Sequence, residues 1–213
     1  MTSVVTVVSV NVGGVRTVEW YGRAVTTGIW KVPVDGRVAV RGVNLDGDDQ
    51  ADRRVHGGPD KAVYAYAVED YAWWSEQLGR ELGPATFGEN LTMEGVDLGK
   101  LVIGTRWRVG STELEVAQPR IPCFKLGLRM GDAGFVDRFG DAARFGAYFR
   151  IVREGDVGAG DEIEMSPRAD GITVTELGRA LHTTDVDVLD RIARDPAVPE
   201  SWRDWAARRR VRQ

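Results

Sequence analysis

Short runs of β-branched and aromatic residues, most of them bounded by glycine, proline or aspartate, recur along the first two-thirds of the chain. Such runs are typical of strands, which we predict over residues 3–10, 37–42, 61–68, 105–110, 111–119 and 147–155. Between the fourth and fifth runs, Gly110 and Ser111 turn the chain, and apolar and charged residues alternate on both sides. We therefore expect a mainly β fold that includes this hairpin.

Helical spacing is scarce in the same part of the chain. Residues 69–82 place Tyr71, Trp74 and Leu78 at helical intervals and predict a helix that ends at the pair Gly83 and Pro84. The few helix signals support the expectation of a β-rich body.

The periodicity changes after the segment SPRADG, residues 166–171. Three short amphipathic helices are predicted beyond it, over residues 173–182, 183–195 and 199–210. We place a boundary near residue 168, with a β-rich domain over residues 1–168 and a C-terminal three-helix domain over residues 169–213.

Composition excludes several classes of protein. The chain has 28 Lys and Arg against 32 Asp and Glu, a formal net charge of -4, so no overall basic field favours a nucleic-acid partner. With one cysteine, no intramolecular disulfide can form. The N-terminus lacks the pattern of a signal peptide, and no apolar run is long enough to span a membrane. We expect a soluble, cytoplasmic protein with no membrane partner.

The spacing of metal-ligating residues argues against a structural zinc site, because the chain has only two histidines, His56 and His182, and one cysteine. Four aspartates crowd the segment NLDGDDQADRR, where a carboxylate site for magnesium or calcium is conceivable: Asp46, Asp48, Asp49 and Asp52. A solvated acidic turn is the simpler interpretation of this cluster.

Phosphate-binding motifs of the Walker and dinucleotide types are absent. Residues 51–61, however, bring Arg53, Arg54 and Lys61 close to Gly57 and Gly58, whose N–H groups can form an anion-binding nest. The alternative is a Gly-Pro turn with exposed arginines.

The one cysteine, Cys123, follows a predicted strand in the segment QPRIPCFKLGLRMG, where two prolines keep the chain out of regular structure. Nearby cations supply positive potential that favours the thiolate, the form that binds soft metals: Arg120, Lys125 and Arg129. A lone cysteine is also commonly a packing residue, and this alternative stays open. Taken singly, His56 fits a local hydrogen-bonding residue and Lys31 a surface lysine.

Residues 27–66, the segment FGENLT at residues 87–92, the segment PRIPCFKL at residues 119–126 and the helical tail occur in an order that resembles the MOSC family, named for the C-terminal domain of molybdenum cofactor sulfurases. The YiiM-type bacterial branch, in which a MOSC domain precedes a three-helix tail, is the most similar. The resemblance covers nearly the whole chain.

This resemblance implies a β-barrel-like domain with few helices and a cysteine that binds the metal of the molybdenum cofactor, Mo-molybdopterin. The implied catalytic trio falls on Lys31, His56 and Cys123, with Cys123 as the metal ligand. We expect the cofactor to be bound by six further residues: Arg53, Arg54, Gly57, Gly58, Asn90 and Arg120. The family is also associated with pyridoxal phosphate binding.

The implied reaction is reduction of N-hydroxylated compounds to amines, and the branch is associated with detoxification of 6-hydroxylaminopurine-type base analogues. Such an oxidoreductase needs a small N-hydroxylated substrate and an electron-donor protein. Two alternatives remain: a sulfur or cofactor carrier that holds a persulfide on Cys123, and a cofactor-free Cys-His hydrolase or transferase.

Two spatial expectations follow. Lys31, His56 and Cys123 should meet in one pocket at the mouth of the β domain, with Arg53 or Arg54 lining it. The tail should pack on itself and on the β domain without adding catalytic groups, and it is a possible docking surface for a redox partner.

Overall fold

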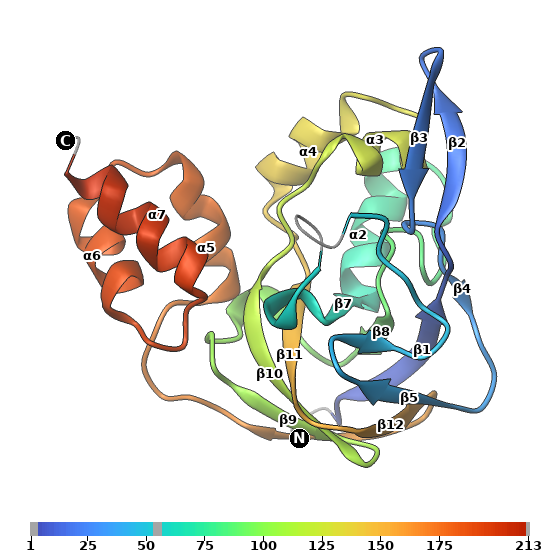
Figure 1. Cartoon of the computed structure of the whole chain (residues 1–213), viewed down its shortest axis with the longest axis horizontal. Coiled ribbons are helices and arrows are strands. Elements are labelled where there is room, and N and C mark those ends of the chain that lie inside the picture. The colour runs from blue at the N-terminus through green and yellow to red at the C-terminus, as the bar shows by residue number, and fades with distance from the viewer. Residues whose placement is uncertain (1–3, 53–56, 212–213) are drawn as a thin grey trace.

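The computed structural model describes residues 4–52 and 57–211 (Figure 1). Three residues singled out by the sequence, Arg53, Arg54 and His56, lie outside the described residues. Their predicted roles therefore stay predictions.

The described part of the chain forms strands and helices in the following order. The strands are β1 (Thr6–Val12), β2 (Arg16–Trp20), β3 (Arg23–Thr27), β4 (Val32–Pro33), β5 (Arg37–Arg41), β6 (Asn44–Leu45), β7 (Val63–Ala67), β8 (Leu91–Glu94), β9 (Arg106–Val109), β10 (Thr112–Pro119), β11 (Ala147–Arg153), β12 (Gly155–Gly158) and β13 (Ile163–Ser166). The helices are η1 (Pro59–Lys61), α2 (Val68–Leu78), η2 (Leu98–Lys100), α3 (Phe124–Met130), α4 (Phe135–Ala142), α5 (Val174–Arg179), η3 (Ala180–His182), α6 (Val186–Arg194) and α7 (Glu200–Arg210).

Eight strands form one mixed sheet in the order β13-β9-β10-β11-β7-β8-β1-β4, in which only β7 and β8 pair in parallel. Backbone hydrogen bonds connect β1 with the segment that leads into β13: Val7 N donates to Asp161 O over 2.9 Å, and Ile163 N donates to Val5 O over 2.9 Å. Because β13 and β1 lie near opposite ends of the strand order, these bonds close the sheet on itself. The expected mainly β, barrel-like fold is confirmed.

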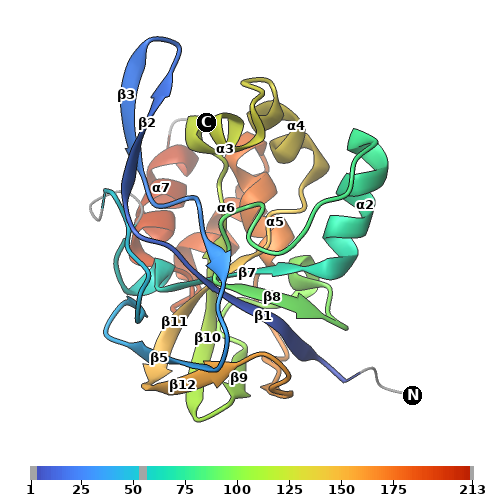
Figure 2. The same cartoon turned by 90° about the vertical axis from the view of Figure 1, so that its right-hand side faces the viewer.

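Two smaller sheets extend this barrel. The sheet β12-β5-β6 lies at its lower end in Figure 1, where Ser111 N donates to Asp156 O over 3.0 Å. The hairpin of β2 and β3 projects from the opposite end, as both views show (Figures 1 and 2).

Each segment that was predicted as a strand contains at least part of a strand in the structure. The predicted hairpin is formed by β9 and β10, in which Leu114 lies opposite Trp107. The end predicted for α2 is wrong. This helix stops at Leu78 because Gly79 takes a left-handed conformation, φ 60°, and Arg80 N donates to Ser75 O over 3.2 Å.

Helices α3 and α4 were not predicted from the sequence. They are only 7 and 8 residues long, so neither offers a long periodic pattern. Leu126 of α3 and Phe135 and Phe139 of α4 are fully buried in one cluster with Trp74 of α2, Phe87 and Tyr66 of β7, which ties α3 and α4 to the barrel.

The three predicted tail helices are present as α5 with η3, α6 and α7. Leu177, Ile192 and Trp202 are buried in the same hydrophobic cluster as Val116 and Phe149 of the barrel. The tail therefore packs both on itself and on the β domain. The division at residue 168 stays a prediction, because this apolar core continues across it.

Polar contacts also connect the tail with the barrel. The Trp202 indole N–H of α7 donates to Gln118 Oε1 of β10 over 2.8 Å, and Gln118 Nε2 donates to the Asp60 carbonyl of η1 over 2.9 Å. Among the described residues, no helix is long and apolar enough to cross a membrane.

Replacement of the tail tryptophan tests this link. Trp202→Phe should lower the free energy of unfolding by about 1 to 2 kcal/mol, because Gln118 Oε1 loses its donor in a buried site. Trp205→Phe on the same helix is the control, since its more exposed indole makes no hydrogen bond within the described chain. Equal losses for the two variants in urea denaturation would contradict a role for the hydrogen bond.

Candidate active site

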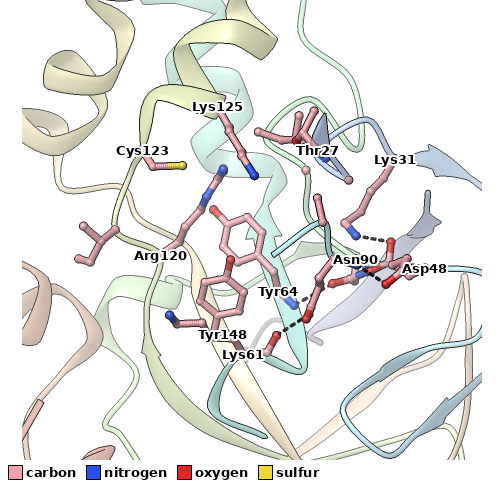
Figure 3. A pocket seen from close by; sticks show the side chains of 17 residues that line it. Thr27, Lys31, Asp48, Lys61, Tyr64, Asn90, Arg120, Cys123, Lys125 and Tyr148 are labelled. Carbon is pink, nitrogen blue, oxygen red and sulfur yellow. Dashed lines mark hydrogen bonds and ion pairs between the residues drawn. The ribbon is translucent and has the colours of Figure 1, made fainter. Parts of the chain in front are cut away.

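One pocket of the protein gathers polar side chains from segments far apart in the sequence (Figure 3). The end of β3 and the residues after it, the loop after β6, the end of η1 and the segment between β10 and α3 all contribute to its wall. The described residues that line it are Thr27, Gly28, Ile29, Lys31, Asp48, Asp49, Gln50, Ala51, Lys61, Tyr64, Gly88, Asn90, Arg120, Ile121, Cys123, Lys125 and Tyr148.

Cys123 lies in the irregular segment that follows β10 and immediately precedes α3, as the flanking prolines predict. Its side chain is half-buried. In Figure 3 the thiol and the side chains of Arg120 and Lys125 point into the same space, and Cys123 is close enough to Arg120 to interact with it electrostatically. A positive neighbour stabilises an anionic thiolate.

Arg120 is held rigidly, although it carries a charge in a buried site. Only 8 % of the residue is exposed, its guanidinium donates a hydrogen bond to the Phe87 carbonyl, and it lies 5.2 Å from the ring centre of Tyr64. These contacts partly compensate the loss of hydration and fix the charge beside the thiol.

Lys31 forms a buried ion pair with Asp48, and their side chains are 7 % and 1 % exposed. Asp48 Oδ1 also accepts a hydrogen bond from Gly13 N over 3.0 Å, and Oδ2 accepts one from Asn90 Nδ2 over 3.0 Å. Burial lowers the pKa of the Lys31 amine, and the Asp48 carboxylate opposes this shift. The pocket therefore contains an amine that gives up its proton more readily than an exposed lysine.

Asn90 connects this ion pair with the sheet. Its Oδ1 accepts a hydrogen bond from Tyr64 N over 3.1 Å, and its Nδ2 also donates to the Asn11 carbonyl over 3.3 Å. Since both polar atoms of the amide are engaged, Asn90 acts on the pocket through Asp48. Direct contact with a cofactor stays a prediction.

Glu89, next to Asn90, anchors the segment that carries it. The side chain is fully buried, and its Oε1 accepts hydrogen bonds from Tyr71, from Ala85 N over 2.7 Å and from Thr92 over 2.8 Å. Oε2 has no hydrogen-bond partner within the described part of the chain. Burial raises the pKa of this carboxyl group.

Two tyrosines on neighbouring strands form the inner wall. Tyr64 of β7 and Tyr148 of β11 are directly paired in the sheet, with ring centres 4.9 Å apart. Burial raises the pKa of both phenols, although the charge of Arg120 opposes the shift. Both therefore remain neutral at physiological pH, and the Tyr64 hydroxyl donates to the Phe145 carbonyl over 2.8 Å.

The wall is positively charged overall. Among the described residues, four cations line it against two carboxylates: Lys31, Lys61, Arg120 and Lys125, with Asp48 and Asp49. A pocket of this charge favours an anionic ligand.

Of the predicted site residues, the structure brings together Lys31, Asn90, Arg120 and Cys123 in one pocket. The interpretation of Lys31 as an isolated surface lysine is wrong. The third member of the predicted trio, His56, lies outside the described residues, as do Arg53 and Arg54.

The two glycines of the predicted anion nest are described but are not among the residues of the pocket wall. Gly58 has φ 96°, and its carbonyl accepts a hydrogen bond from Lys61 N over 3.1 Å at the start of η1. The segment thus directs Lys61 to the pocket, and phosphate binding by Gly57 and Gly58 stays a prediction.

The sequence did not identify Asp48 as a site residue. We grouped it with a solvated acidic turn, whereas its side chain is buried against Lys31. Asp46 of the same turn does face solvent, where it pairs with Arg41. Within residues 4–52 and 57–211 no group of three or more His, Cys, Asp or Glu is placed to bind a metal ion.

The ion pair can be tested by changing each of the two aspartates. Asp48→Asn should lower the free energy of unfolding by about 3 to 5 kcal/mol, because it leaves the Lys31 charge buried without a counter-charge. Asp46→Asn is the matched control and should cost less than about 1 kcal/mol, since its ion pair is exposed. Urea denaturation of both variants gives the comparison, and similar costs would show that the buried pair contributes little.

The chain is similar to known proteins over most of its length. The chain is 38% identical over 200 residues to the uncharacterized protein YflK of Bacillus subtilis, covering 92% of this chain and 90% of that protein. It is 30% identical over 200 residues to protein YiiM of Escherichia coli, covering 91% of this chain and 89% of that protein. It is also 30% identical over 151 residues to a protein of Gibberella moniliformis named reductase, covering 69% of this chain but 27% of that protein.

The crystal structure of YiiM from Geobacillus stearothermophilus superposes with a TM-score of 0.80 at 29% identity, covering 97% of this chain and 99% of that one. The profile of the MOSC domain matches residues 52–164, which include strands β7 to β12 and the Cys123 segment. The chain therefore belongs to the MOSC domain family, and it is similar to the YiiM proteins over nearly its whole length.

Proposed function

We propose that this protein is a molybdenum-cofactor-dependent oxidoreductase that reduces N-hydroxylated compounds, of the 6-hydroxylaminopurine type, to amines. The observation that supports it most is the single thiol of Cys123, which shares a cationic pocket with Lys31 and Arg120 in a chain of the MOSC family. The relative named reductase agrees with redox chemistry.

The donor set of the pocket fits this cofactor. Its metal is already bound by pterin sulfurs, so one soft thiolate from Cys123 completes what the protein must supply. Lys61, Arg120 and Lys125 suit the phosphate of the cofactor, together with the predicted donors Arg53 and Arg54. When bound, the cofactor would supply the electrons for the reduction.

The net reaction adds two electrons and two protons to R–NH–OH, breaks the N–O bond and releases R–NH2 and water. The leaving oxygen must be protonated as the bond breaks, so a proton donor is needed in the pocket. Lys31 is suited to this task, because burial lowers its pKa while Asp48 and Asn90 fix its position. His56 is the other candidate from the sequence.

Replacement of the thiol separates a metal ligand from a packing residue. Cys123→Ser should stay folded, with a cost of about 1 to 2 kcal/mol, because it changes one half-buried atom. It should lose bound molybdenum and the reduction of 6-hydroxylaminopurine, since a protonated alcohol is a poor ligand for a soft site. Molybdenum per chain and activity with a dithionite-type donor are measured after expression in a host that makes the cofactor.

Tyr148→Phe serves as the control, because it removes a hydroxyl from the same wall and leaves the thiol in place. It should retain the metal. A folded Cys123→Ser variant with full molybdenum and full activity would refute the proposal. Sulfide release from the wild type on reduction, without metal, would instead favour the persulfide carrier.

The proton donor can be tested with a substitution that preserves charge. Lys31→Arg keeps a cation opposite Asp48 but cannot release a proton near neutral pH. Turnover should fall by about 10² to 10⁴ if Lys31 is the acid. In the wild type, the rate should decline as pH rises through the lowered pKa of Lys31, since only the protonated amine is active, and Lys31→Arg should lack this decline. If His56→Ala removes the decline and Lys31→Arg does not, His56 is the donor.

A further inference from the structure

Arginine side chains cluster around Trp30, outside the pocket. The guanidinium of Arg16, from β2, lies 4.1 Å from the ring centre of Trp30, and that of Arg129, from α3, lies 5.8 Å from it. Arg80, just after α2, is close enough to Arg129 to repel it electrostatically. We call Arg16, Arg80, Arg129 and Trp30 the arginine patch.

The patch lacks the counter-charges that other arginines of the protein have. Across the described chain, none of its three guanidinium groups forms an ion pair with a carboxylate, whereas Arg37, Arg106 and 9 more arginines do. The Arg129 Nε is buried without a hydrogen-bond partner among the described residues. Glu89 attracts Arg129 electrostatically without forming an ion pair with it, so the exposed Arg16 and Arg80 are the members of the patch that can best bind the carboxylates of a partner.

The patch adjoins the candidate active site. Trp30 stands between Ile29 and Lys31, both of which line the pocket. Lys125, also in the pocket wall, precedes Arg129 by four residues in α3, so the two cations lie on one face of that helix. Figures 1 and 2 both show α3 beside the base of the β2–β3 hairpin that carries Arg16. Positive charge thus continues from the pocket to the surface.

We propose that the arginine patch docks an acidic electron-carrier protein that reduces the active site. This inference rests on the proposed function, which requires two electrons from an outside donor for each N–O bond broken. Carboxylates of such a carrier would pair with the exposed Arg16 and Arg80 and with Arg129. The carrier would then lie next to the pocket that contains Cys123.

Nucleic acid fits the patch less well. The chain has a net charge of -4, so repulsion from the chain as a whole would oppose the binding of a long polyanion at this patch. A compact acidic protein needs only the local charge.

The experiment compares two kinds of donor with the cofactor-loaded full-length protein. An acidic flavodoxin and an acidic [2Fe–2S] ferredoxin, each kept reduced by its reductase, are compared with reduced benzyl viologen, a small cation that needs no docking surface. In Arg16→Glu/Arg80→Glu, the KM for at least one carrier should rise about tenfold at low ionic strength, and the difference should shrink as salt is added. Turnover with benzyl viologen should not change.

Arg153→Glu is the matched control, because Arg153 is an exposed arginine at the far end of β11 that makes no ion pair within the described chain. Arg208→Glu on α7 tests the tail as the alternative docking surface. The proposal would be overturned if the KM for both carriers is unchanged in the double variant. It would also be overturned if the KM for a carrier rises only in Arg208→Glu. A loss of single-stranded oligonucleotide binding with no change in KM would identify the patch as a nucleic-acid site instead.

Direct titration keeps this test separate from the proposed function. If the wild type does not turn over even with benzyl viologen, the proposed function fails, and calorimetric binding of each carrier to wild type and to Arg16→Glu/Arg80→Glu still decides the docking. Binding that the double variant weakens about tenfold supports the patch. Absence of binding to the wild type, or equal binding to both, contradicts it.

Discussion

The candidate active site depends on the buried carboxylate of Asp48. This group binds Lys31, Gly13 and Asn90, which come from three separate segments of the chain, and so it joins the loop after β3 to β1 and to the residues before β8. A charge buried this deeply is tolerated only when its partners are all in place. The same interaction that stabilises the loops therefore also positions a lysine with a lowered pKa in the pocket.

The opposite wall of the pocket is organised by the sheet. Gln118, Tyr148 and Tyr64 are paired across β10, β11 and β7, and Arg120 and Cys123 follow directly where β10 ends. The helical tail supports this wall from outside through the hydrogen bonds from Trp202 to Gln118 and from Gln118 to η1, which precedes β7 and contributes Lys61 to the pocket. No described residue of the tail lines the pocket. The tail thus contributes support and no chemical group to the described wall.

Much of the fold was predictable from the sequence, because alternating β-branched runs and the change of period after residue 166 are local signals. The short helices α3 and α4 were not predictable, since their buried residues pack in a cluster formed by side chains from distant segments. Cys123 could be predicted as a site residue because it is the single thiol. Lys31 could be predicted only from the order of motifs that resembles the MOSC family. Asp48 could not be separated from its acidic neighbours, because only the folded chain places it opposite a lysine 17 residues away. His56 lies outside the described residues, so its catalytic role stays a prediction.

In the proposed function, the Cys123 sulfur binds the metal of the cofactor. X-ray absorption at the molybdenum edge tests it most directly, because it counts the sulfur neighbours of the metal without relying on turnover. The wild-type protein should show one sulfur neighbour beyond those that the pterin and any sulfido ligand supply, and Cys123→Ser protein reconstituted with the same cofactor should lack that neighbour. Equal numbers of sulfur neighbours in the two proteins would mean that Cys123 is not a ligand of the metal.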